Sequence, residues 1–326
     1  MQIDNIKQLI DEDFSAVNTL ITHELHTDVD LINQLSQHII YSGGKRIRPV
    51  LVLLSAHACG YNVAARDHIA VAAIIEFIHT ATLLHDDVVD ESTLRRGRKT
   101  ANAIWGNEAS VLVGDFLYSR AFQMMVRLKN SHVNVMRIFA DTTNTIAEGE
   151  VLQLLNCHND QINLAQYMRI IYCKTAKLFE AAAQLGAELA NLPEAHCQAM
   201  ATYGKHLGNA FQLIDDTLDY AADVKAAGKQ TGSDLAQGKP TMPLIHVLEH
   251  GTAAEQALVR TALHDANTDQ WEAVLAAINA NGGLTITQQA ACNEVDQALS
   301  ALMVLKPSPY RDALEQLAQF SLQRNY

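Results

Sequence analysis

Proline is scarce in this chain, and its distribution is informative. Only six prolines occur in 326 residues, and none lies between Pro49 and Pro193. Because proline is the residue that most reliably ends a helix, long helices are permitted throughout that stretch. Period-two alternation of apolar and polar residues is also rare, so few half-buried strands are expected. The sequence therefore predicts an all-α fold.

Cysteine, positive charge and long apolar runs are also limited. The five cysteines include no CxxC pair, which indicates neither a disulfide framework nor a zinc site and favours a reducing compartment. A formal net charge of −12 would repel a nucleic-acid backbone. No apolar run approaches the roughly 18 residues typical of a membrane span, and the N-terminal "MQIDNIKQLIDEDF" is too acidic for a signal peptide. We expect a cytoplasmic protein with no nucleic-acid partner and at most peripheral membrane contact.

Several stretches of the sequence show the apolar periodicity of helices. In "DHIAVAAIIEFIHTATLLHDDVVD", which begins at residue 67, apolar residues recur at three- and four-residue steps and alanine is frequent. Similar patterns run through 108–130, 132–156, 164–190 and 196–222. Turn signals such as "ESTLRRGRKT" are short, and no Gly/Ser-rich or charge-rich linker divides the chain. One domain spanning residues 1–326, a large helical bundle, is the favoured interpretation.

Three carboxylates end the first of these helical stretches. In a helix, Asp86 and Asp90 are one turn apart on the same face, roughly 6 Å along the axis, with Asp87 beside them. Oxygen ligands at this spacing suit Mg²⁺, which completes its shell with water and substrate phosphate. A single DDxxD motif is equally typical of a solvated, acidic helix end.

A second copy of the DDxxD pattern favours a metal site over a solvated helix end. Asp215, Asp216 and Asp219 in "FQLIDDTLDY" repeat the spacing on another helix-like stretch. Two such motifs facing each other across a bundle could hold several Mg²⁺ ions around one diphosphate. Glycine-rich and cation-rich segments, which suit phosphate groups, accompany them. Their basic residues are Lys45, Arg46, Arg48, Arg95, Arg96, Lys174, Lys229 and Lys239.

In these motifs the sequence resembles the trans-isoprenyl diphosphate synthases over almost its full length. The matching stretches are "GGKRIRP", "EFIHTATLLHDDVVDESTLRRG", "GDFLYSRAF", "EGEVLQL", "KTAKLFEAA", "FQLIDDTLDY" and "GKPTMPLI". The resemblance implies an antiparallel α-helical bundle around a deep central cavity, usually a homodimer. It also implies two or three Mg²⁺ ions and two substrates, isopentenyl diphosphate and an allylic diphosphate.

The resemblance also implies roles for individual residues. Both aspartate motifs would bind Mg²⁺ and the allylic diphosphate. The isopentenyl diphosphate group would be bound by Lys45, Arg48, His79 and Arg96. The allylic diphosphate would be bound by Arg95, Lys174, Thr175, Gln212 and Lys229. The catalytic residues would be Asp86, Asp87, Asp90, Arg95, Lys174, Asp215 and Asp216.

Two small residues one turn before Asp86 bear on product length. Ala81 and Thr82 leave room for a growing chain, where short-chain members of the resembled family often carry bulky aromatics. Small residues also serve close helix packing, so the pattern alone does not decide. The resemblance implies an all-trans product of octaprenyl length, built on farnesyl diphosphate for a ubiquinone side chain. Shorter or longer products, from geranylgeranyl to nonaprenyl, remain alternatives.

Three other interpretations compete with a synthase. His85 next to Asp86 could belong to an HD-type phosphohydrolase, although the second motif supplies no histidine. A class I terpene cyclase would share the first motif but lack the basic "GGKRIRP" segment. A catalytically silent partner subunit would be expected to have lost one of the motifs, and both are intact here.

Overall fold

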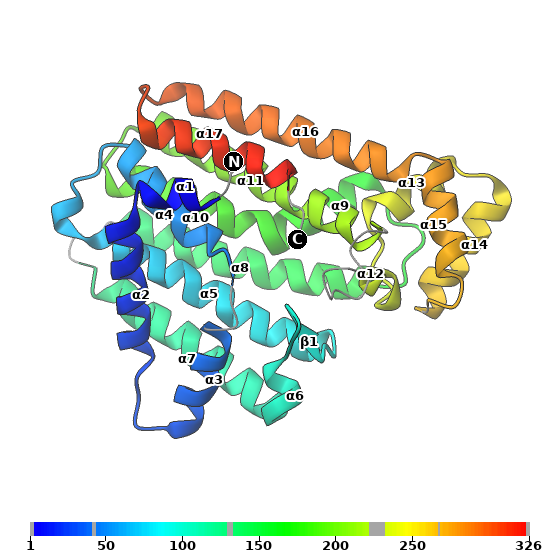
Figure 1. Ribbon diagram of the computed structural model, residues 1–326, viewed down its shortest axis with the longest axis horizontal. Coiled ribbons are helices and arrows are strands. Elements are labelled where there is room, and N and C mark those ends of the chain that lie inside the picture. Colours follow the sequence, from blue (N-terminus) through cyan, green and yellow to red (C-terminus); the bar gives the residue numbers. More distant parts are fainter. Residues whose placement is uncertain (1–2, 41–43, 129–132, 222–231, 267, 324–326) are drawn as a thin grey trace. The chain divides into compact units, whose positions relative to one another are not determined.

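The computed structural model describes residues 3–40, 44–128, 133–221, 232–266 and 268–323 (Figure 1). The chain forms two compact units. Unit 1 comprises residues 1–143, 181–201 and 302–317, and unit 2 comprises residues 144–180, 202–301 and 318–326. Each unit is described here by itself, and the single domain expected from the sequence stays a prediction.

Unit 1 is helical apart from one small hairpin (Figure 1). Its complete elements are α1 (Ile3–Gln8), α2 (Asp11–Leu25), α3 (Asp30–Ile40), α4 (Ile47–Ala58), the 3₁₀ turn η1 (Val63–Ala65), α5 (Asp67–Val89), β1 (Leu94–Arg95), β2 (Arg98–Lys99), α6 (Ala101–Trp105), α7 (Asn107–Val126) and η4 (Leu302–Val304). Helix α5 packs against α2, α4 and α7, which makes it the central element of this unit.

Unit 2 is built from shorter helices. They are α9 (Leu164–Ile171), the π-helical turn η2 (Tyr172–Ala176), α12 (Ser233–Ala236), α13 (Met242–His250), α14 (Ala253–Asp265), α15 (Trp271–Ala280) and α16 (Gly283–Ala301). The unit boundaries fall inside four further helices, α8 (Val133–Asn156), α10 (Lys177–Leu189), α11 (Glu194–Asp219) and α17 (Pro309–Leu322). The all-α prediction is confirmed, and the helical ranges expected between residues 108 and 222 match α7 to α11 closely.

Helix α5 owes its length to its composition. It carries no proline or glycine over 23 residues, and 14 of them are buried. By length and apolar content α5 could cross a membrane, so the expectation that no segment reaches that threshold was wrong. Because 67% of its most apolar window is buried inside the protein, α5 has the burial typical of a core helix.

The segment "ESTLRRGRKT", expected to be a simple turn, forms the hairpin of β1 and β2. Leu94 pairs with Lys99 and Arg95 with Arg98, which leaves a two-residue loop. Both loop residues have positive φ, 52° at Arg96 and 73° at Gly97, as a type I′ turn requires. Glycine adopts this conformation freely, whereas it costs an arginine about 1 kcal/mol. Arg96 is therefore held at the hairpin tip by its surroundings.

Candidate active site

The first aspartate motif lies at the C-terminal end of α5. Asp86 and Asp87 occupy its last turn, and Asp90 is the C-cap, whose backbone N–H donates to the Asp86 carbonyl at 2.8 Å. The C-terminal end of a helix carries a partial negative charge, so carboxylates there are repelled by the helix as well as by one another. A bound cation would relieve both repulsions.

Within this motif Asp87 differs from its neighbours. It is buried, and its Oδ1 accepts hydrogen bonds from Arg95 Nε at 2.9 Å and Nη2 at 2.8 Å. Burial raises the pKa of Asp87, and the Arg95 guanidinium opposes that rise. The Asp87 carbonyl accepts from the backbone of Ser92 and from Asn102 Nδ2. Asp87 therefore anchors the hairpin, while Asp86 and Asp90 are half-buried at the surface of the helix end.

Basic side chains of unit 1 gather around the middle of α5. Arg48 Nη1 lies 3.1 Å from His79 Nε2. Burial, followed by the cations of Arg48, Arg96 and Arg95, holds the pKa of His79 well below its usual value. His79 is therefore neutral, and since the guanidinium can only donate, Nε2 accepts and the ring proton is on Nδ1. The positive charge of this cluster therefore comes from its arginines, since its histidine is neutral.

One acid, whose side chain is 12% exposed, lies among these cations. Glu76 is one turn before His79 on α5, and Arg46 Nε lies 3.8 Å from its Oε1. Burial raises the pKa of Glu76, while Arg46, Arg48 and Arg96 lower it. Three guanidiniums against one carboxylate leave a surplus of positive charge, which suits a diphosphate. We did not single out Glu76 from the sequence, although an acid inside an apolar helix was a usable signal.

Gly44 lies beside the Arg96 guanidinium. A Cβ on Gly44 would lie 2.5 Å from Arg96 Nη1, so a larger residue there would push this side chain aside. Lys45 follows and is half-buried. The structure thus brings Arg48, His79 and Arg96 into one cluster with Glu76, as the expected isopentenyl diphosphate site requires.

The second aspartate motif ends α11 in unit 2, again at a negative helix end. Asp216 is buried, and its two oxygens accept from Tyr167 Oη at 2.5 Å and Gln212 Nε2 at 2.7 Å. The other end of the Gln212 amide accepts from Thr175 Oγ1 at 2.8 Å. Two expected substrate-binding residues, Thr175 and Gln212, are therefore linked to the motif. Tyr167 was missed, because its position 49 residues away carries no sequence signal.

Asp219 has a structural task in addition to any metal contact. Its Oδ1 accepts from Ser233 N at 3.2 Å and Oγ at 2.9 Å, and its Oδ2 accepts from Asp234 N at 3.0 Å. These bonds cap the short helix α12. Burial and the charges of Asp219 and Asp216 raise the pKa of Asp234 well above its usual value, so a fourth carboxyl belongs to this cluster. Asp215 is only half-buried and is the most accessible of the motif.

Lys174 is presented by the π-helical turn η2, a distortion that is frequent at functional sites. Its Nζ donates to Glu150 Oε2 at 2.6 Å. A Cβ on Gly149 would lie 2.7 Å from the Lys174 backbone nitrogen, so this glycine permits α8 to approach the turn. Lys229, the remaining expected cation, lies outside the described residues.

Both carboxylate groups fit Mg²⁺. All of the ligand atoms that their side chains offer are oxygens, and each group lies at the end of a helix where negative charge accumulates. In unit 2 the burial of Asp216, reinforced by Asp215 and Asp219, raises its pKa from 3.8 to about 7, against the hydrogen bonds from Tyr167 and Gln212. A divalent cation would favour the ionised form of these acids.

The raised pKa of Asp216 has a consequence for stability. Between about pH 4 and 7, folded metal-free protein keeps a proton that the unfolded chain releases near 3.8, so the free energy of unfolding should fall as pH rises. In Asp216→Asn the free energy of unfolding should depend less on pH over this range. Urea unfolding at several pH values without metal measures it. The matched variant Asp296→Asn, at an exposed position of α16, should leave it unchanged. An unaltered pH profile in Asp216→Asn would contradict the assignment.

The structure also places the residues expected to control product length. Ala81 is buried on α5, and the half-buried Thr82 donates its hydroxyl to the His79 carbonyl at 2.7 Å. His85, the residue that raised the phosphohydrolase alternative, packs over Gly114 of α7 and lies 3.2 Å from the Val111 carbonyl. It therefore serves the α5–α7 contact, and this geometry offers no support for an HD-type metal site.

Known proteins are similar to this chain in sequence and in fold. The Polyprenyl synthetase family model matches residues 29–280. Octaprenyl diphosphate synthase of Escherichia coli is 51% identical over 326 residues, which is all of both chains. A geranyl-diphosphate-specific all-trans-nonaprenyl-diphosphate synthase of Rhodobacter capsulatus is 44% identical, over 96% of this chain and 95% of its own.

Solved structures agree. A polyprenyl synthase from Caulobacter crescentus, complexed with calcium and isoprenyl diphosphate, superposes with a TM-score of 0.93 and 40% identity, over 99% of this chain and 98% of the other. A decaprenyl diphosphate synthase from Rhodobacter capsulatus superposes with a TM-score of 0.92 and 41% identity, over 99% of both chains. The chain therefore belongs to the polyprenyl synthetase family, whose members condense isopentenyl diphosphate head to tail into long all-trans polyprenyl diphosphates.

Proposed function

We propose that this trans-polyprenyl diphosphate synthase extends farnesyl diphosphate to octaprenyl diphosphate, the precursor of a ubiquinone side chain. The observation that carries the proposal is the full-length 51% identity to an octaprenyl diphosphate synthase. Small residues at Ala81 and Thr82, one turn before the first aspartate motif, are consistent with a long product. The 44% identical nonaprenyl enzyme keeps a neighbouring chain length as the second candidate.

The metal would be held by the two aspartate groups. Asp86, Asp87 and Asp90 would supply the oxygen ligands of the first group and Asp215, Asp216 and Asp219 those of the second. Asp86, Asp90 and Asp215 are the less buried members. Mg²⁺, as two or three ions, would supply charge neutralisation to a leaving diphosphate. The calcium and isoprenyl diphosphate in the Caulobacter crescentus structure support a cation-dependent diphosphate site in this family.

The two diphosphates would be bound by different cations. Lys45, Arg48 and Arg96 would bind isopentenyl diphosphate beside neutral His79, whose Nδ1–H can donate. Arg95, Lys174, Thr175, Gln212 and Lys229 would bind the allylic diphosphate. Arg95 and Lys174 are each already paired with an acid, Asp87 and Glu150, so their side chains are oriented before substrate arrives.

The reaction depends on stabilising the negative charge that develops on the leaving diphosphate. The carbon–oxygen bond of the allylic diphosphate breaks, and its electron pair leaves with the diphosphate, where the fixed cations stabilise the developing charge. The double bond of isopentenyl diphosphate attacks the allylic carbon, and loss of a proton, which the released diphosphate accepts, restores an allylic product one unit longer. The apolar residues of α5 before Asp86 would exclude water from the cation.

The enzyme would act as a cytoplasmic homodimer. Large apolar side chains are exposed on α7 of unit 1, at Leu112, Phe122 and Val126. Others are exposed on α8 in unit 2, at Val151, Leu154 and Leu155. Because monomers rarely expose such patches, a second copy of the chain is the proposed occupant. Peripheral membrane contact would serve release of the apolar product.

One experiment tests the proposed activity. The purified enzyme is incubated with Mg²⁺, labelled isopentenyl diphosphate and farnesyl diphosphate, and the dephosphorylated products are sized by chromatography. Octaprenyl alcohol is expected as the main product. A nonaprenyl product would select the second candidate, and cyclised hydrocarbon without chain extension would indicate a terpene cyclase instead.

The basic cluster around Glu76 gives a prediction about substrate affinity. Arg96→Ala removes a charge-assisted hydrogen-bond donor, worth about 1.5–3 kcal/mol, so the KM for isopentenyl diphosphate should rise roughly tenfold or more. The KM for the allylic substrate should change less. The measurement is steady-state kinetics. The control is Arg98→Ala, because Arg98 is exposed on the same hairpin, as Arg96 is, but has no proposed role in substrate binding. A larger effect on the allylic substrate would reassign Arg96 to the other diphosphate.

A further inference from the structure

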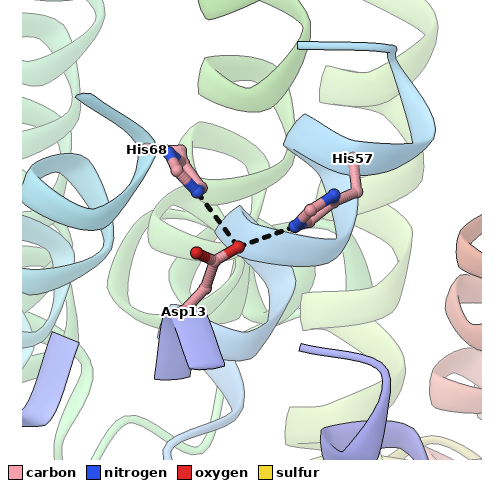
Figure 2. A group of neighbouring side chains, drawn as sticks. All are labelled: Asp13, His57 and His68. Atoms are coloured by element: carbon pink, nitrogen blue, oxygen red, sulfur yellow. Dashed lines mark hydrogen bonds and ion pairs between the residues drawn. The ribbon is translucent and has the colours of Figure 1, made fainter. Parts of the chain in front are cut away.

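Three metal-type ligands from three helices meet in unit 1, at the other end of α5 from the first aspartate motif (Figure 2). They are Asp13 in the first turn of α2, His57 in the last turn of α4 and His68 in the first turn of α5. His57 Nε2 lies 2.7 Å and His68 Nε2 3.1 Å from the same oxygen, Asp13 Oδ2. Figure 2 shows both rings directed at that carboxylate.

The spacing of these atoms fits a small transition metal. The three ligand atoms all lie within 4.8 Å of one another. A tetrahedral Zn²⁺ with bonds of about 2.0 Å places its ligand atoms about 3.3 Å apart. The observed separations from Asp13 Oδ2, 2.7 Å to His57 Nε2 and 3.1 Å to His68 Nε2, are slightly shorter. A small outward movement of the carboxylate would admit the ion.

His68 is poorly satisfied without an ion. Its side chain is fully buried, and among the described residues neither ring nitrogen has a partner in hydrogen-bonding geometry. Burial lowers the pKa of His68, assisted by His57 and Arg66 and opposed by Asp13. Its position at the positive end of α5 also disfavours an imidazolium. A neutral imidazole here has a ring nitrogen lone pair that a metal ion can accept.

The surroundings orient the rings and leave one side accessible. Tyr310 stacks on the His57 ring with centroids 4.4 Å apart, and Tyr61 packs against His68 at 5.1 Å. The side chains of His57 and Asp13 are 16% and 17% exposed, so water can reach the cluster. Three protein ligands would leave the fourth position of a tetrahedral zinc ion to water.

The cluster is chemically distinct from the Mg²⁺ ligands. It offers two imidazole nitrogens and one carboxylate oxygen, whereas the aspartate motifs offer oxygen only. Nitrogen ligands suit zinc and related ions and are not those that Mg²⁺ prefers. His68 also lies 18 residues before Asp86 on α5, which corresponds to about 27 Å along a straight helix. Cysteine spacing gave no indication of such a site.

We propose that Asp13, His57 and His68 form a Zn²⁺ site, completed by one water molecule, that fastens α2 to α4 and α5. The ion replaces the contact between Asp13 and the two rings with three bonds that join separate helices. Its role is structural, so turnover at saturating Mg²⁺ does not require it.

The test uses full-length protein that has been treated with a chelator and transferred into buffer with excess Mg²⁺. Titration with Zn²⁺ is followed by calorimetry, and Co²⁺ is the spectroscopic probe because tetrahedral Co²⁺ absorbs in the visible. One tight site per chain, a raised Tm and unchanged condensation rates are expected. His57→Gln and Asp13→Asn should each weaken binding by about tenfold or more and abolish the Zn²⁺-dependent rise in Tm.

A matched variant separates this site from adventitious histidines. His246 and His250 stack one turn apart on α13, and His250→Ala removes that competing pair while leaving the cluster intact. Binding that is retained in His250→Ala and lost in His57→Gln supports the proposal. Binding that survives both His57→Gln and Asp13→Asn, or wild-type protein that shows no tight site, overturns it and leaves a hydrogen-bonded triad. Circular dichroism verifies that the variants are folded.

Discussion

Replacing Asp86 with alanine is expected to reduce the condensation rate by a factor of about 10³ or more while leaving the fold intact. Asp86 is half-buried at the negative end of α5, one turn from Asp90. Its removal takes away one of the two accessible ligands of the first motif. The measurement is the initial rate at which labelled isopentenyl diphosphate enters extractable product at saturating Mg²⁺.

The control for this prediction is an acid of similar setting without a proposed role. Asp296→Ala, at an exposed position inside α16, should retain the full rate. Far-ultraviolet circular dichroism and Tm should be near those of the unaltered protein for both variants. Near-normal turnover in folded Asp86→Ala would rule out this aspartate as a required metal ligand.

Thr82→Phe should shorten the product, which is the largest change expected from a residue outside the charged cluster. Thr82 is half-buried one turn before Asp86, and its hydroxyl bonds only to the carbonyl of its own helix at His79. A phenyl ring there would occupy space that the growing chain needs, while the first condensations continue at a comparable rate. Chromatography of dephosphorylated products should show the main band shifted below octaprenyl.

A conservative substitution isolates the effect of size at this position. Thr82→Ser keeps the hydroxyl and reduces the volume, so its products should be as long as those of the unaltered enzyme, or longer. If Thr82→Phe and Thr82→Ser yield the same product distribution, residue 82 does not line the path of the chain. The length limit would then be sought elsewhere, with the buried Leu117 and Ala121 of α7 as the next candidates.

Local patterns in the sequence were sufficient to predict the helices and the ends of the two key ones. The absence of proline and the three- and four-residue apolar spacing are properties of neighbouring residues, so α5, α7, α8 and α11 follow from them. The DDxxD spacing is equally local. What it could not reveal is the additional task of Asp219, whose carboxylate accepts from Ser233 and Asp234 and so caps α12.

Partners distant in sequence escaped prediction for a physical reason. The bond between Tyr167 and Asp216 joins residues 49 positions apart, and the Arg48–His79 contact joins residues 31 apart. Such pairs form only when tertiary packing brings two elements together, and neither residue type is unusual in its local setting. The hairpin was missed because Arg96 holds a positive φ normally given to glycine or asparagine, at a cost that surrounding contacts must offset.

The type I′ hairpin also limits how this enzyme can change. Arg95 and Arg96 are adjacent in sequence, yet Arg95 extends to the carboxylate of Asp87, while the Arg96 guanidinium lies where a Cβ on Gly44 would point. Surface loops usually tolerate the insertion or deletion of one residue. Here a single insertion between β1 and β2 would shift the pairing register and redirect both guanidiniums at once. The spacing of the two arginines is therefore as much a functional trait as their charge.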